Sequence, residues 1–232
     1  MNGILLPPAY LAPAEYYSFL ISGRCTVEQY ANYNRHTYAN RCDILTADGV
    51  HALTVPVEKP REKTLIRDIR ISYSSKWQQT HWRTLCAAYL SSPFFEYYQD
   101  DFAPFFSRRF TFLLDLDMEL QSLILSLLGF SAENIRLSDH YAPAGKINII
   151  DMRERIVPKK NSVSLHEESV VPYYQVFSGR FGFTAGLSII DMLFNLGNES
   201  RLYLMRMRPD ALLATASSGQ GTDAESRDIN IF

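Results

Sequence analysis

The first thirty residues read as a short apolar strand, a proline-containing loop, a helix and a second strand. The run GILLPPAYL (3–11) predicts a buried strand whose end is kept extended by two adjacent prolines. Residues 12–22 predict a short helix, because Pro13 falls near its first turn and Gly23 follows its end. A second strand is expected in CTVEQY (25–30). This order is typical of a layered α/β domain.

A tight-turn dipeptide lies between two β-rich runs in residues 41–57. Asp48-Gly49 is typical of a two-residue hairpin turn, which would place Ala47 opposite Val50. Because side chains alternate along a strand, the hairpin has one apolar face that we expect in the core. That face holds Cys42, Ile44, Leu53, Val55 and Val57.

The rest of the chain predicts further helices and strands, with three candidate helix caps. Strand-like patterns occupy 64–73, the start of an otherwise irregular surface loop at 134–163, and a run before a glycine-rich turn at 173–186. Helices are expected in 74–90, 92–106, 115–129 and 187–197. The expected caps are a Ser75–Gln78 capping box, Asp115 or Asp117, and a Ser188–Asp191 capping box.

These elements predict one α/β domain over residues 1–208. It would combine a mixed β-sheet, the N-terminal β-loop-α-β unit, a β-hairpin and several packed helices. Residues 209–232 are rich in Ser, Gly, Ala and Asp and predict a flexible tail.

Charge and cysteine content narrow the function classes. The net charge of −2 lacks the basic excess that nucleic-acid binding needs. The three cysteines have no paired spacing, so a disulfide framework or a four-thiolate zinc site is not expected. No signal peptide pattern and no run of about 20 apolar residues is present, which predicts a cytoplasmic protein without membrane insertion.

No strong catalytic motif is present, so single residues have to be weighed. His36 and His81 are candidate general bases, and the alternatives are a polar rim residue for His36 and a half-buried, hydrogen-bonded histidine for His81. Cys42 is expected in the core, and capping accounts for Asp191. His51, His140 and His166 are too scattered to propose a metal site.

Arg35 and Arg41 are the strongest binding candidates, because a guanidinium binds a phosphate or carboxylate through two parallel hydrogen bonds. Together with Asn40 they could line an anion-binding rim. If the strand were unbroken, the two arginines would lie about 20 Å apart, at about 3.3 Å per residue. The alternative is a solvated strand face on which the arginines pair with Asp43 or Glu28.

Four blocks in order carry a resemblance to a known family: LPPAYLAPAEYYSFL, YNRHTYANRCDILTADGVHALTVPV, WQQTHWRTLCAAYLSSPFFEYY and YYQVFSGRFGFTAGLSIIDMLFNLG. The chain resembles the WbqC-like family of bacterial surface-polysaccharide (O-antigen) gene clusters. It departs from that family's pattern at Ala12, at Arg35-His36 and at Ala39, where the family usually has an arginine. Positions that match the family in residue or chemistry are Tyr10, Arg35, Asn40, Arg41, Trp77, His81, Trp82 and Gln175.

The resemblance implies a role in surface-polysaccharide biosynthesis, and members have been suggested to transfer glycine or another amino acid onto a sugar. We therefore expect a transferase that joins an amino-acid or acyl donor to a nucleotide- or lipid-linked sugar. Its substrate would contact Tyr10, Arg35, Asn40, Arg41, Trp82 and Gln175, with His36 or His81 as base. The alternative is a non-catalytic sugar-binding or assembly partner of a glycosyltransferase machinery. The sequence identifies no cofactor and no metal, and leaves homo-oligomerisation open.

Overall fold

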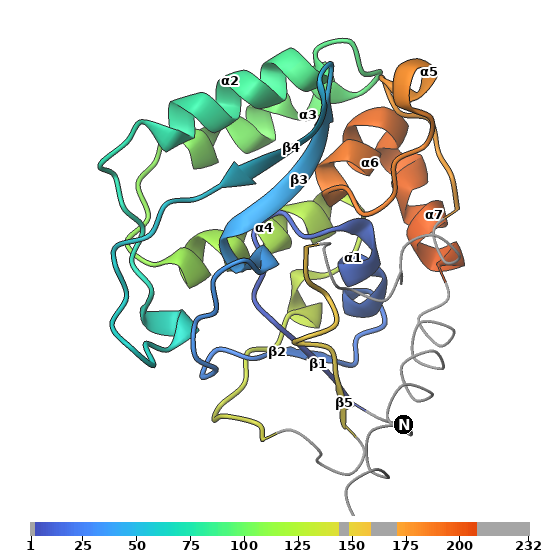
Figure 1. Cartoon of the computed structure of the whole chain (residues 1–232). Helices are drawn as coiled ribbons and strands as arrows, with labels where there is room; N and C mark the ends of the chain where they lie inside the picture. The colour runs from blue at the N-terminus through green and yellow to red at the C-terminus, as the bar shows by residue number, and fades with distance from the viewer. Residues whose placement is uncertain (1–2, 144–148, 159–170, 208–232) are drawn as a thin grey trace, which may run out of the picture.

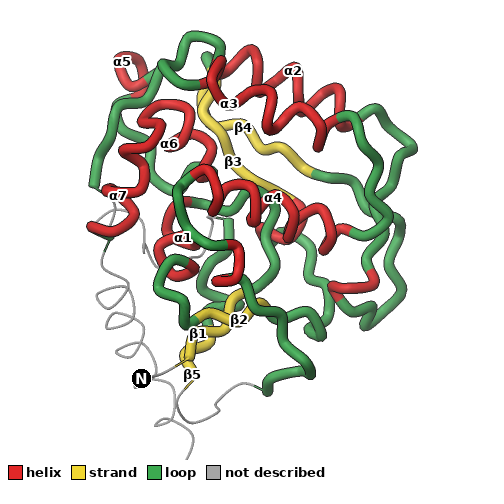
Figure 2. Tube along the Cα trace, turned by 180° about the vertical axis from the view of Figure 1, so that it is seen from behind, coloured by secondary structure: helices red, strands yellow, loops and turns green. Residues whose placement is uncertain are grey.

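The computed structural model describes residues 3–143, 149–158 and 171–207. A parallel sheet lies at one end of the molecule, and an antiparallel hairpin lies nearer the other end, with helices between and around them (Figures 1 and 2). The strands are β1 (Gly3–Leu6), β2 (Cys25–Val27), β3 (Arg41–Thr46), β4 (Gly49–Thr54) and β5 (Ile149–Asp151). The helices are α1 (Ala14–Leu20), α2 (Trp77–Tyr89), α3 (Phe95–Phe102), α4 (Leu113–Leu127), α5 (Ser178–Phe181), α6 (Ile189–Leu196) and α7 (Ser200–Arg206).

The parallel sheet is built around the first strand. β1 pairs with β2 on one side and with β5 on the other, so that Ile4 lies between Cys25 and Ile150. A single parallel bridge from Val27 to Leu137 extends the sheet beyond β2. The spatial order is therefore Leu137, β2, β1, β5. The predicted α/β class and the N-terminal β-loop-α-β unit are confirmed, with the strands in two sheets rather than one mixed sheet.

Helices α1 and α4 fill the space between the parallel sheet and the hairpin in both views (Figures 1 and 2). Every residue of α1 is buried, and its sequence is mostly aromatic and apolar, with Glu15 and Ser18 as its polar residues. Helix α2 buries the stripe that its spacing predicted, at Trp77, His81, Leu85 and Tyr89.

The predicted hairpin is present, but its turn lies one residue earlier than expected. Thr46 pairs with Gly49 instead of Ala47 with Val50, so the turn dipeptide is Ala47-Asp48. Gly49 has φ +104° and uses its left-handed freedom as the first residue of β4. Each residue of β3 is therefore opposite a residue of β4 two positions away from the expected one, and this even shift leaves the two faces of the hairpin unchanged. Cys42, Ile44, Leu53 and Val55 are buried as predicted.

Two of the predicted caps are wrong, and one is half right. Helix α2 begins after Lys76, because the Gln78 side chain donates to the carbonyls of Phe105 and Arg108 instead of capping. Helix α4 begins at Leu113, so neither aspartate caps it. Ser188 does cap α6, but the Asp191 carboxylate bonds to other elements.

Three predicted segments differ in the structure. Residues 64–73 are not a strand: their alternation brings Ile69 and Ile71 into the core around a 3-10 turn. Residues 134–163 were predicted as a surface loop, yet they supply β5. Residues 173–186 hold α5 and no strand. The predicted tail at 209–232 lies outside the described residues, and the domain boundary at 208 stays a prediction.

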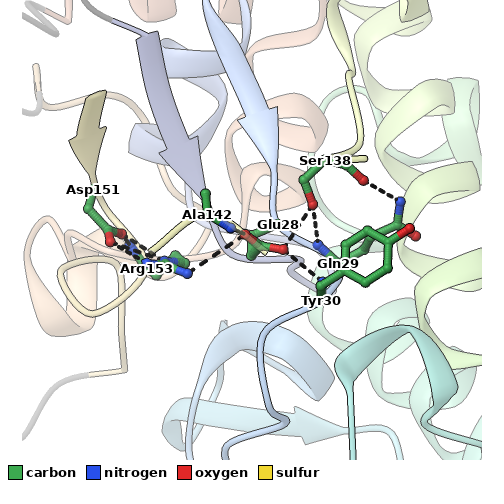
Figure 3. A network of polar contacts seen from close by, with 7 residues as sticks. All are labelled: Glu28, Gln29, Tyr30, Ser138, Ala142, Asp151 and Arg153. Atoms are coloured by element: carbon green, nitrogen blue, oxygen red, sulfur yellow. Dashed lines mark hydrogen bonds and ion pairs between the residues drawn. The ribbon is translucent and has the colours of Figure 1, made fainter. Parts of the chain in front are cut away.

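Glu28 ties the carboxyl ends of the parallel strands together (Figure 3). Its carboxylate is fully buried and accepts hydrogen bonds from the Ser138 hydroxyl (2.9 Å), the Tyr30 amide (2.8 Å) and the Ala142 amide (2.8 Å). Arg153 lies 3.8 Å from the same carboxylate and binds Asp151 at the end of β5. One buried carboxylate thus links β2, the segment after Leu137 and β5.

Glu28→Ala should lower the free energy of unfolding by about 3 kcal/mol, because several buried donors lose their acceptor. Glu28→Gln keeps the shape and should cost less. Urea denaturation would measure both variants, with Asp68→Asn as the control, since the Arg67–Asp68 pair is exposed and should be worth less than about 1 kcal/mol. A loss for Glu28→Ala no larger than for Asp68→Asn would refute the role of Glu28.

Candidate functional site

The strand order points to the carboxyl end of β1. The chain passes from β1 through α1 to β2 on one side and later places β5 on the other side. In open parallel sheets, ligands bind beyond the carboxyl ends of the strands where the order reverses in this way. The segment that leaves β1 at this point is Pro7–Pro13, which we call the β1–α1 loop.

The β1–α1 loop is buried, and four hydrogen bonds from three other segments hold its backbone. The bonds run from Gln121 Nε2 to Ala9 O (3.1 Å), from Tyr10 N to Tyr38 O (2.8 Å), from Ser188 Oγ to Leu11 O (2.7 Å) and from Ile189 N to Ala12 O (2.9 Å). Leu11 has φ +44°, an uncommon conformation for a bulky residue. Such strain persists only where the surroundings fix it, and it is concentrated at functional sites.

Tyr10 joins this loop to α2. Its hydroxyl lies 3.1 Å from Nδ1 of His81, and the His81 ring packs edge-on against Trp77. Burial lowers the pKa of His81 to about 4, and the nearby carbonyl of Thr54 only partly offsets this shift. His81 is therefore neutral at pH 7, and Nδ1 can accept the Tyr10 proton.

Asp117 and Gln121 face the same interior from α4, since they are four residues apart on one helix. Both Asp117 oxygens and Gln121 Oε1 are buried and have no hydrogen-bond partner in the part of the chain that the structure describes. Burial raises the pKa of Asp117 well above 3.8. Its charge adds to burial in raising the pKa of the Tyr10 and Tyr17 hydroxyls.

We call Tyr10, Tyr17, Trp77, His81, Asp117 and Gln121 the Asp117 cluster. The Tyr17 hydroxyl and Trp77 Nε1 are likewise buried without a partner among the described residues. Unpaired buried polar atoms are costly and rare, so a group of them calls for a bound molecule or a proton as explanation. Burial raises the pKa of the acid in this cluster, Asp117, and lowers the pKa of its base, His81. Opposed shifts of this kind are the pattern of acid–base sites.

The residues of the expected anion-binding rim, Arg35, Asn40 and Arg41, lie on the surface or make hydrogen bonds within the fold. Arg35 and His36 are exposed in a turn, so the chain bends and no continuous strand joins Arg35 to Arg41. Arg41 is half-buried and pairs with Asp43 at 2.9 Å, as its alternative interpretation predicted. Asn40 is buried and donates to the carbonyl of Val55 (2.8 Å), which closes the open end of the hairpin.

Trp82 and Gln175 also have structural contacts. Trp82 is half-buried and stacks on Phe106, with ring centres 5.4 Å apart. Gln175 is buried, and its amide bonds to the backbone of Thr184 in both directions. It also donates to Asp191 at 3.2 Å. The structure thus brings Tyr10 and His81 into hydrogen-bond distance.

Sequence reasoning missed Asp117 and Gln121 as site residues. A signal was available, because both fall on the apolar stripe of α4 between Leu116, Leu120 and Ile124. Polar residues at positions that face a core are functional or destabilising. No group of three or more metal-ligating side chains lies in the described ranges, where His51 and His140 are exposed. His166 lies outside the described residues.

Comparison with known proteins decides the family. The sequence profile of the WbqC-like protein family matches residues 8–162. The chain belongs to the WbqC-like protein family. A Mycobacterium tuberculosis protein named "Uncharacterized protein Rv1507c" is 28% identical over 197 residues, which cover 76% of this chain and 85% of that protein. No solved structure shows a significant match.

The match includes residues 8–13 of the β1–α1 loop, the three helices of the Asp117 cluster and the Glu28–Arg153 contact. Asp191 and Gln175 lie beyond it. No helix in the described part of the chain is long and apolar enough to span a membrane.

The His81 ring should stay neutral at pH values where a free histidine is already protonated. Burial puts its pKa at about 4, against 6.5 for a free histidine. Since the unfolded chain then binds the extra proton between these values, His81 makes the fold less stable as the pH falls from about 6.5 to about 4. NMR titration of the ring protons should show the His81 ring unchanged at pH 5.5. Titration of His81 near 6.5 would contradict this interpretation.

Asp117→Asn should make the protein more stable than wild type at pH 8 and should have a much smaller effect at pH 4. The folded carboxyl holds its proton above 3.8, so wild-type stability is lost as the pH rises towards the raised pKa, and asparagine removes that loss. Urea denaturation at both pH values measures the difference. A variant that is less stable than wild type at pH 8 would mean that ionised Asp117 has a stabilising partner.

Proposed function

We propose that this protein is a transferase of surface-polysaccharide (O-antigen) biosynthesis that attaches an amino acid or acyl group to a sugar. Family membership supports the pathway, and the Asp117 cluster supports the chemistry. The observation that carries the proposal is the set of unpaired buried acceptors on Asp117 and Gln121, placed beyond the carboxyl end of β1.

The unpaired atoms suit one end of an amino-acid donor. Both Asp117 oxygens and Gln121 Oε1 are acceptors, whereas an ammonium group carries three N–H donors and no acceptor. An ammonium beside Asp117 would also supply the positive charge that this carboxyl lacks, and would lower its pKa on binding. An acyl donor without an amine would leave those acceptors unpaired, so an amino acid is the better fit.

Acyl transfer needs a base for the acceptor of the sugar. A sugar hydroxyl or amine would attack the carbonyl carbon of the activated donor, forming the new carbon–oxygen or carbon–nitrogen bond as the bond to the leaving group breaks. The acceptor would release its proton to the Tyr10 hydroxyl as that hydroxyl gives its own proton to Nδ1 of His81, which is neutral at pH 7. Burial of these groups would keep water away from the activated donor.

Arg35 would act at the outer side of this site. Tyr33 is half-buried, and its pKa is raised by burial and, to a smaller extent, by the charge of Asp117, while Arg35 lowers it. The turn that carries exposed Arg35 and His36 therefore lies within electrostatic reach of the cluster. A phosphate of the donor or of the sugar could be held there by Arg35, with Arg41 and His36 as further candidates.

The second candidate function is a non-catalytic sugar-binding or assembly partner of a glycosyltransferase machinery. The observation in its favour is that Tyr10 and His81 are at most 4% exposed, which leaves little room for a substrate without movement of the β1–α1 loop. The two functions differ in whether His81 is needed for turnover.

Binding comes first in the test. Thermal-shift measurements with ATP, CoA, nucleotide sugars and glycine should show stabilisation by the donor class through mass action. The shift should be smaller in Asp117→Asn if the ammonium site is correct. An unchanged shift in that variant would remove the ammonium assignment.

Turnover with the donor so found should fall by about 10²-fold or more in His81→Asn, because asparagine can keep a bond to Tyr10 but cannot take a proton. His140→Asn, on an exposed part of the chain, is the matched control and should keep wild-type turnover. Equal turnover in both variants would favour the non-catalytic function.

A further inference from the structure

A second polar site lies near the start of α4, outside the Asp117 cluster. It is an open hollow of about 450 Å³. Its lining residues are Arg108, Arg109, Phe110, Thr111, Asp115, Met118 and Glu119. None of them is among the predicted site residues or within the four sequence blocks that carry the resemblance.

Hydrogen bonds of the Gln78 and Tyr73 side chains hold the loop that forms the hollow. Gln78 donates to the carbonyls of Phe105 (3.0 Å) and Arg108 (2.6 Å). The Tyr73 hydroxyl donates to the carbonyl of Phe110 (3.1 Å) and accepts from its amide (2.8 Å). The hollow is therefore largely formed before a ligand arrives, as binding sites for small molecules usually are.

Charged side chains of both signs line the hollow, and two of them make no ion pair with the described residues. Arg108 pairs with Glu119 and lies over the Phe110 ring at 4.3 Å. Arg109 lies over the Tyr73 ring at 4.7 Å, and it makes no ion pair within the described residues. Asp115 likewise has no ion-pair partner in the described part of the chain. An arginine stacked on an aromatic face keeps its edge N–H groups free for a phosphate.

We propose that this hollow binds a sugar that carries a phosphate group. Arg109 would hold the phosphate through its free N–H edge, and the Asp115 carboxylate would accept hydrogen bonds from sugar hydroxyls. Phe110 and Met118 give an apolar surface for the C–H face of the ring. The volume of about 450 Å³ leaves room for a hexose phosphate.

Aromatic contacts connect the hollow with the Asp117 cluster. The Tyr73 ring lies 6.1 Å from Trp77, and Trp77 lies 5.1 Å from His81. Met118 in the hollow directly follows Asp117 in α4. This inference rests on the proposed function in one respect: the bound sugar phosphate would be the sugar substrate of the transferase.

The test is titration calorimetry of the full chain with glucose 1-phosphate, glucose and inorganic phosphate. We expect glucose 1-phosphate to bind at least tenfold more tightly than either of the other two, because only it reaches both Arg109 and Asp115. Arg109→Gln should weaken glucose 1-phosphate binding at least tenfold. Asp115→Asn should reduce its preference over inorganic phosphate.

The control is Arg67→Gln. Arg67 stacks on Tyr30 at 4.9 Å, much as Arg109 stacks on Tyr73, but it does not line the hollow. It should keep wild-type binding, and thermal melting should confirm that all three variants are folded. Equal binding by the Arg109 and Arg67 variants, or no binding of glucose 1-phosphate to the wild type, would overturn the proposal.

The two proposals can fail separately. Loss of turnover in His81→Asn with unchanged glucose 1-phosphate binding supports both sites. If His81→Asn keeps full turnover while Arg109→Gln loses binding, the hollow stands and the transferase mechanism falls.

Discussion

The backbone of the buried β1–α1 loop has to find hydrogen-bond partners away from water, and this requirement organises the molecule. A buried loop cannot leave its amides and carbonyls unpaired without a cost of about 1–3 kcal/mol each. The 3-10 turn at Tyr38, helix α4 and the start of α6 each supply a partner. The elements that surround the loop therefore converge on the carboxyl end of β1, which is where the Asp117 cluster lies.

Two buried aspartates show two ways of placing a carboxyl in this core. Asp191 accepts hydrogen bonds from Tyr89 (3.0 Å), Tyr173 (2.8 Å) and Gln175, and its pKa rises only to about 6 because those bonds offset part of the burial. Asp117 has no such donors among the described residues, so burial acts on its pKa unopposed. The bonds of Asp191 connect α6 with α2. Burial of Asp117, in contrast, lowers the stability of the fold, and this carboxyl forms no hydrogen bond among the described residues. A cost of that kind is expected at functional sites.

The surface hollow and the buried cluster have complementary properties. The hollow is open, lined by charges of both signs and pre-formed by Gln78 and Tyr73. The cluster is buried and is joined to the hollow through Tyr73, Trp77 and His81. Recognition of a charged sugar at the surface and chemistry in a dry interior would suit such an arrangement, because electrostatic interactions are stronger where water is excluded.

The sequence by itself determined the local elements whose signals are local. The β-loop-α-β start, the two faces of the hairpin, the buried Cys42 and the helix stops at Gly129 and Gly197 follow from periodicity and turn chemistry, and the structure confirms them. The two faces of the hairpin are predicted correctly although the turn position is wrong, because side-chain alternation depends only on whether the shift in strand pairing is even or odd. The family was also readable from ordered sequence blocks.

Only the tertiary structure decided what depends on distant contacts. β5 is three residues long, and its pairing with β1 is what makes residues 149–151 a strand. Gln78 and Asp191 match capping boxes in the sequence. In the structure, Gln78 donates to the carbonyl of Phe105, and Asp191 accepts hydrogen bonds from Tyr89 and Tyr173. Burial removed Asp117 from water and gave it no partner, and this pKa-shifting desolvation is a property of the packed interior that no local pattern encodes.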